Sequence, residues 1–152
     1  MKQIIEPVDK KLIMEELTPE KFVRHTNNAN NELYIFTAKN SPSLMREVGR
    51  LRELTFRSAG GGTGFEVDID EYDTCENCYK QLIVWDPKES EILGGYRFHS
   101  VDPTKGEEIN LSTKHLFNFS DRFKPDYRPQ MIELGRSFGQ PKYQAVSRPG
   151  KR

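Results

Sequence analysis

A short segment near the end of the chain combines residue types that are typical of acid–base catalysis. Residues 132–138 read IELGRSF, so Glu133 and Arg136 stand in an otherwise apolar, strand-like run. Residues three apart point to opposite faces of a regular strand. A bulge at Gly135 would place both charges on one face, where they could pair, and would free a backbone N–H. This arrangement suits acyl transfer, with a carboxylate as base for an amine and an N–H for the oxyanion. A structural ion pair at a sheet end fits the same residues.

An acidic segment over residues 66–73 is a second candidate for chemistry. It reads EVDIDEYD and contains Asp68, Asp70 and Asp73. A calcium loop of the EF-hand type would need a glycine and a distal glutamate, and both are absent. We interpret Asp68 as a solvated charge without a partner, because charge runs usually face water. Asp70 and Asp73 belong to a larger set of residues described below.

Two further patterns resemble binding motifs. Cys75 and Cys78 form a Cys-x-x-Cys pair, but no spacing to His25, His99 or His115 matches a common zinc finger. We therefore expect two ordinary thiols in a surface loop and no metal.

The sequence AGGGTG over residues 59–64 contains the glycines of a phosphate loop but follows a helix instead of leading into one, and no Gly-Lys-Ser/Thr follows. It predicts a helix stop and a flexible loop. A lid over a substrate cleft is the functional alternative.

One long helix positions several of these charges. It opens at Ser41 and Pro42 and ends near Ser58. Arg52 lies on the flank of its apolar face, beside Phe56, where a guanidinium can reach into a cleft. The apolar face itself is formed by Leu44, Val48, Leu51 and Thr55. The opposite, solvated side carries Arg46, Arg50 and Arg57.

The remaining elements form a sheet around this helix. The predicted strands are residues 33–38, 79–85, 92–98 and 131–138. The second and third are separated by a linker of hairpin length, which makes them antiparallel neighbours. Helices are predicted over residues 10–22, with Thr18 and Pro19 as a helix start, and around 111–117 and 120–123. We expect an α+β fold, an α/β sandwich in which helices flank a mostly antiparallel, bulged sheet.

The composition excludes several classes of protein. The 152 residues correspond to about one domain. Lys and Arg number 23, as do Asp and Glu, so no basic surplus supports nucleic-acid binding. No apolar run is long enough to span a membrane, and the first residues contain no signal-peptide core. Two cysteines are too few for a disulfide framework, which favours a cytoplasmic location.

Five motifs occur in an order that resembles a known family. They are Arg52-x-x-x-Phe56, Asp70-Glu71-Tyr72-Asp73, Gly94-Gly95-Tyr96-Arg97, Phe117 and Glu133-Leu134-Gly135-Arg136. Together they resemble the amino-acid N-acyltransferases of the GNAT superfamily over residues 33–144. The bacterial group that makes lyso-ornithine and glycine lipids, often labelled hemolysin, matches best. The acyl-homoserine-lactone synthases are similar in fold.

The resemblance implies a GNAT-like fold and a reaction. The acyl or 3-hydroxyacyl group is carried as a phosphopantetheine thioester on acyl carrier protein, with acyl-CoA less favoured, and no cofactor is permanently bound. The acceptor is the α-amine of an amino acid, glycine or ornithine, in lyso-aminolipid synthesis. The implied partners are acyl carrier protein and the amino acid, with peripheral association at the inner face of the membrane and no nucleic acid.

The resemblance also implies roles for the matched residues. Glu133 is the general base, and Arg136 is grouped with it as catalytic. The acceptor pocket is shaped by a charge network in which one arginine can clamp a carboxylate. That network joins Asp70 and Asp73 to Arg52, Arg97 and Arg136. Phe56 and Phe117 line the acyl channel, although Phe56 fits a core position equally well.

The chain is expected to correspond to the N-terminal portion of such an enzyme. We divide it into a helical lead-in (1–30), an incomplete GNAT-like domain (31–145) and a truncated basic tail (146–152). The tail stands where the family has a pyrophosphate-binding turn, a helix and further strands. Without those strands the last strand becomes an unpaired edge prone to association.

Three other functions remain as alternatives. The first is an enzyme resembling the acyl-homoserine-lactone synthases. The second is an inactive remnant that binds acyl-loaded carrier protein or a partner subunit. A membrane-lytic toxin is disfavoured because no basic amphipathic helix of the required kind is present.

Overall fold

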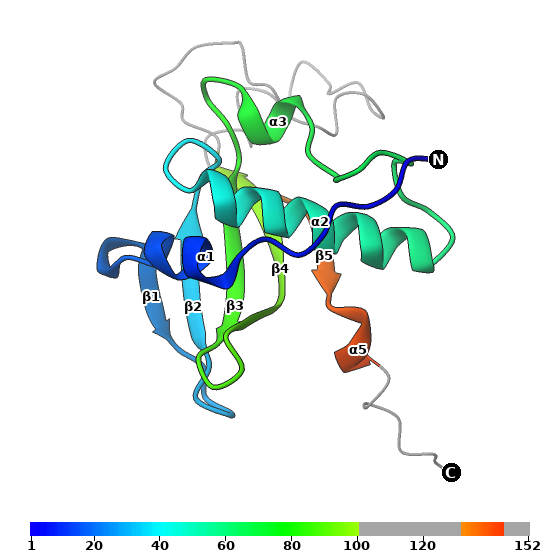
Figure 1. Ribbon diagram of the computed structural model, residues 1–152. Helices are drawn as coiled ribbons and strands as arrows, with labels where there is room; N and C mark the ends of the chain where they lie inside the picture. Colours follow the sequence, from blue (N-terminus) through cyan, green and yellow to red (C-terminus); the bar gives the residue numbers. More distant parts are fainter. Residues whose placement is uncertain (101–131, 145–152) are drawn as a thin grey trace.

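An antiparallel sheet forms the centre of the structure. The computed structural model describes residues 1–100 and 132–144. Within these residues the strand order is β1-β2-β3-β4-β5, and each neighbouring pair is antiparallel (Figure 1). The strands are β1 (Phe22–His25), β2 (Glu32–Phe36), β3 (Lys80–Asp86), β4 (Glu91–Ser100) and β5 (Ile132–Gly139).

Helices cover one face and one end of this sheet. The long helix α2 lies across the face together with the short α1, and α3 lies at one end (Figure 1). Within the described residues, no helix is long and apolar enough to cross a membrane. The helices are α1 (Lys10–Glu16), the 3-10 helix η1 (Pro19–Lys21), α2 (Pro42–Ser58), α3 (Glu71–Thr74) and α5 (Pro141–Gln144).

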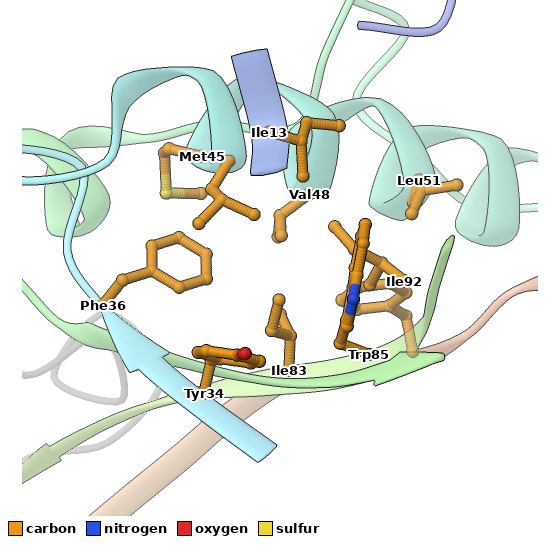
Figure 2. Packing of buried hydrophobic residues seen from close by; sticks show 11 residues of the cluster. Ile13, Tyr34, Phe36, Met45, Val48, Leu51, Ile83, Trp85 and Ile92 are labelled. Carbon is orange, nitrogen blue, oxygen red and sulfur yellow. The ribbon is translucent and has the colours of Figure 1, made fainter. Parts of the chain in front are cut away.

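The core lies between α2 and the sheet. The predicted apolar face of α2 is confirmed, since Val48 and Leu51 are each 1% exposed and Thr55 is buried. Val48 and Leu51 belong to one cluster with Ile83 and Trp85 of β3, as Figure 2 shows. Burial of such large apolar side chains supplies the main stabilisation of the sheet against the helix, about 25 cal/mol per Å² removed from water.

The four predicted strands are confirmed to within two residues at either end. The predicted helix over residues 10–22 is wrong in its second half. Thr18 is extended (φ −86°, ψ 158°), as a residue before proline tends to be, and this ends the helical path before Pro19. The chain then continues as β1, which pairs with β2, so the lead-in of residues 1–30 is helical only in part. The helices predicted around 111–117 and 120–123 lie outside the described residues.

Candidate active site

A fully buried arginine on α2 is the centre of the candidate site. The Nη1 atom of Arg52 lies 3.1 Å from Oδ2 of Asp73, and both side chains are 0% exposed. Its Nη2 atom donates to Gln81 Oε1 at 2.5 Å, and Gln81 Nε2 donates to Asp73 Oδ1 at 2.8 Å. Burial lowers the pKa of Arg52, and the charge of Asp73 opposes this shift. Arg52 is thus enclosed by its partners, in contrast to the prediction that its guanidinium reaches into a cleft.

The short helix α3 fixes two aspartates. Asp70 is its N-cap and accepts a hydrogen bond of 3.0 Å from the N–H of Tyr72. Asp73 Oδ2 in turn accepts one of 3.0 Å from the N–H of Asp70, which completes a capping box. A helix of four residues is unstable alone, so these bonds and the pair with Arg52 determine where the two carboxylates lie.

Arg97 on β4 contacts both carboxylates. Its Nη1 atom lies 2.7 Å from Asp70 Oδ1 and 3.2 Å from Asp73 Oδ2. Its guanidinium carbon lies 5.1 Å from the ring centre of Tyr79, within cation–π distance. Burial works against the charge of Asp70, but the hydrogen bond and the charge of Arg97 outweigh it and lower the pKa of Asp70. The expected charge network is therefore present.

β5 contains the bulge that the sequence predicts. Arg136 and Ser137 together face a single residue of β4, Tyr96. Arg136 has a φ of +50°, a left-handed conformation that costs energy for a residue with a side chain. The bulge follows Gly135 directly, and the unusual backbone conformation falls on Arg136 instead of on the glycine.

The bulge turns Arg136 toward the segment that precedes α3. Its Nε atom lies 3.2 Å from Asp68 Oδ2, and its Nη2 atom lies 3.4 Å from Asp70 Oδ2. The sequence predicts a pair between Arg136 and Glu133, and this prediction is wrong: the two aspartates take the guanidinium instead. Arg136 therefore joins the charge network through Asp68 and Asp70.

Asp68 is buried, and its predicted solvent exposure is wrong. It is only 2% exposed, because its segment packs directly on α2. The N–H of Asp68 donates to the carbonyl of Gly49 at 2.9 Å, and a Cβ on Gly49 would lie 2.6 Å from Ile69. Burial raises the pKa of Asp68, while Arg136 and Arg52 oppose this shift.

Glu133 lies further along β5, beside an aromatic pair. It is 8% exposed and faces His99 in the strand register. It accepts a hydrogen bond from the hydroxyl of Tyr79, whose ring stacks on His99 with 4.8 Å between ring centres. Tyr79 also packs edge-on against Tyr72 of α3. Glu133 and Arg136 thus have different partners, which contact α3 or belong to the segment that precedes it.

An open cleft of about 560 Å³ adjoins the network. It lies among the end of α2, the bulge of β5 and the glycine-rich loop, which we define as residues 59–64. Its lining includes Phe56, Gly61, Gly62, Thr63, Asp68 and Arg136. The Arg136 side chain is 37% exposed, whereas those of Arg52 and Arg97 are 0% and 3%. Arg136 is therefore the arginine of the network that faces the cleft.

Residues 51–148 match the family model described as acetyltransferase (GNAT) domain. This region contains the network, the bulge and all of the cleft lining, and it is more than half of the chain. The chain belongs to the GNAT acetyltransferase family. The expected GNAT-like fold, with an antiparallel bulged sheet and flanking helices, is confirmed.

Two relatives align with almost the whole of this chain. A protein of Bacteroides thetaiotaomicron named glycine N(alpha)-acyltransferase is 54% identical over 149 residues, which are 96% of this chain and 44% of the relative. A protein of Phocaeicola vulgatus with the same name is 50% identical over 96% of this chain and 46% of the relative. The chain thus spans about half the length of the curated relatives it matches. No solved structure gives a significant match.

Phe56 and the two cysteines, which the sequence analysis also singles out, take no part in the described contacts of the charge network. Phe56 is half-buried, packs against the core and also lines the cleft, which fits both interpretations of it. Phe117 lies outside the described residues. Cys75 and Cys78 are free, half-buried thiols. Residues 1–100 and 132–144 contain no group of three or more His, Cys, Asp or Glu that could hold a metal.

Three buried residues of the GNAT domain were missed by the sequence interpretation: Tyr79, Gln81 and Glu53. Tyr79 directly precedes β3 and lies two residues before Gln81, and Ile83 and Trp85 follow at the same spacing. Strand periodicity therefore assigns all four to one face, which is buried. That signal could have found the first two. For Glu53, the spacing to Arg57 on the same helix indicates an ion pair, but its other partners, Thr63 and Gly64, lie in an irregular loop and leave no signal of burial.

Proposed function

We propose that this GNAT domain transfers an acyl group from a thioester to the α-amine of glycine. The names of the two relatives support glycine as acceptor, and membership of the family supports acyl transfer from a thioester. The observation that carries the proposal is the bulge of β5, which directs Arg136 to the cleft and leaves Glu133 on the same side of the sheet. The activity of the relatives is a proposal for this chain, which covers less than half of their length.

Glu133 is the proposed general base. The ammonium of glycine must lose a proton before its nitrogen can attack a carbonyl. In the proposed reaction Glu133 takes that proton, directly or through water. A C–N bond then forms, the C–S bond breaks, and the second proton of the nitrogen passes to the leaving sulfur. The products are N-acylglycine, a thiol and one proton released to water.

Arg136 is the proposed partner of the glycine carboxylate. A carboxylate is bound most strongly by two parallel N–H bonds from a guanidinium. Arg52 and Arg97 already pair with Asp73 and Asp70 and are themselves shielded from water, whereas Arg136 is partly open to the cleft. Its contacts with Asp68 and Asp70 are long, at 3.2 and 3.4 Å, so a substrate carboxylate can compete for it.

The proposed donor is an acyl or 3-hydroxyacyl group on the phosphopantetheine arm of acyl carrier protein, with acyl-CoA as the alternative. This choice, a role in lyso-aminolipid synthesis and association with the inner face of the membrane rest on the resemblance of the sequence motifs.

Product analysis tests the proposal. The purified chain is incubated with an acyl-loaded carrier protein or acyl-CoA and with glycine, ornithine or S-adenosylmethionine, and products are identified by mass spectrometry. We expect N-acylglycine and an equal amount of free thiol. An acyl-homoserine lactone as product would contradict the proposal, and so would binding of the donor without thiol release.

A further inference from the structure

Glu53 on α2 is a fully buried carboxylate that lies outside the charge network. Glu53 is 0% exposed, yet the groups that donate to it come from Arg57 and from the glycine-rich loop at the surface. Oε1 accepts hydrogen bonds from the N–H and the hydroxyl of Thr63, at 2.9 and 2.6 Å. Oε2 accepts from the N–H of Gly64 and from Arg57 Nε, both at 2.9 Å. Four donors therefore compensate the cost of burying this charge.

The glycine-rich loop is held by these bonds. Gly61, Gly62 and Thr63 are exposed, and a loop of this composition would otherwise be mobile. At Gly62, with φ +90°, a Cβ would lie 2.9 Å from Glu53 Oε2 and 3.2 Å from the backbone of Arg57. A glycine at this position lets the loop close over the carboxylate.

Arg57, which pairs with Glu53, also binds the first residues of the chain. Its Nη1 atom donates to the carbonyl of Lys2 and its Nη2 atom to that of Phe65, each at 2.8 Å. The N–H of Lys2 donates to the carbonyl of Gly64 at 2.8 Å. Burial alone would raise the pKa of Glu53, but its hydrogen bonds lower the pKa to about 2, so the carboxylate stays charged at neutral pH.

We infer that Glu53 is a positioning residue, which holds the glycine-rich loop as a fixed wall of the cleft beside Arg136. This inference rests on the proposed function. Glu53 does not line the cleft, but Gly61, Gly62 and Thr63 line it together with Arg136. A wall that is fixed before the acceptor arrives lowers the entropic cost of orienting a small amino acid. The chemical class bound against this wall is the free α-amino acid of the proposed function, whose carboxylate pairs with Arg136.

The test is Glu53→Gln, with Glu47→Gln as its matched control. The new side-chain amide would place its NH₂ group against N–H or O–H groups that now donate to the carboxylate of Glu53, so some of these hydrogen bonds would be lost. We expect the KM for glycine to rise at least 10-fold, with the KM for the thioester within about twofold. Hydrogen exchange at the amides of Thr63 and Gly64 should accelerate at least 10-fold. Glu47 is also buried on α2 and paired with an arginine, Arg50, but it lies away from the loop, so its variant should change neither quantity.

Thr63→Val provides a second route if Glu53→Gln does not fold. It keeps the shape of the side chain and removes only the hydroxyl donor, so both effects should appear in the same direction and smaller. An unchanged KM for glycine together with unchanged exchange at residues 63 and 64 in the folded variant would overturn the inference. Absence of N-acylglycine from the unmodified chain would instead contradict the proposed function, and hydrogen exchange alone would then decide whether Glu53 holds the loop.

Discussion

At the scale of single residues, the burial of charge organises the site. Arg52 and Asp73 are both shielded from water, and each is tolerated there because the other compensates it. The resemblance of the motifs to the GNAT superfamily predicted both residues as members of one network. The burial of Asp68 could not be predicted, because it depends on the contact of its segment with Gly49, which leaves no periodic pattern in the sequence.

Asp73→Asn tests the cost of this burial. The variant keeps the shape of the side chain but leaves the charge of Arg52 without its closest counter-charge, and Arg97 loses one of two partners. We expect the free energy of unfolding to fall by about 3 kcal/mol in urea titrations. The exposed Glu66→Gln should change it by less than about 0.5 kcal/mol. Equal stability of the two variants would show that the pair does not compensate burial.

At the scale of elements, close contact between strands explains the glycines of the Gly94-Gly95-Tyr96-Arg97 motif. A Cβ on Gly95 would lie 2.3 Å from the carbonyl oxygen of Leu82, and one on Gly94 would lie 2.6 Å from that of Phe138. Runs of apolar and β-branched residues predicted β2 to β5 to within two residues, and the helical period predicted α2. β1 was missed because it is short and largely exposed, so it carries no apolar alternation.

Two glycine variants test this explanation. Gly95→Ala should lower the free energy of unfolding by about 2 kcal/mol or more, because the new methyl group collides with the backbone of β3. Gly135→Ala should cost less than about 0.5 kcal/mol, since its Cβ would meet only Arg97 Nε at 3.9 Å. Urea titrations measure both. A large loss for Gly135→Ala would show that the bulge depends on this glycine.

At the scale of the whole molecule, β5 is the edge of the described sheet and carries exposed apolar side chains. Ile132 is 60% and Leu134 63% exposed. Exposed apolar edges of this kind favour association between chains. The order of helices and strands predicted the α+β fold class, since it restricts how layers can pack. The register of β5 on β4, which places Arg136 at the cleft, needed the structure because a bulge shifts the pairing by one residue.

Leu134→Lys tests the expected association. The unmodified chain should show concentration-dependent self-association in analytical ultracentrifugation, and the variant should sediment as a monomer. Leu54→Lys, on the exposed side of α2, is the control and should associate like the unmodified chain. Monomeric behaviour of the unmodified chain, or association that survives Leu134→Lys, would contradict this expectation.

The assignment of Glu133 as the base that deprotonates the amine is tested most directly by Glu133→Gln. The amide keeps the size of the side chain and a hydrogen-bond acceptor for Tyr79, but it cannot take the proton of the ammonium. Steady-state N-acylation of glycine is measured beside equilibrium binding of the acyl donor. We expect turnover to fall by about 10²-fold or more with donor binding unchanged. Turnover equal to that of the unmodified chain would contradict the account.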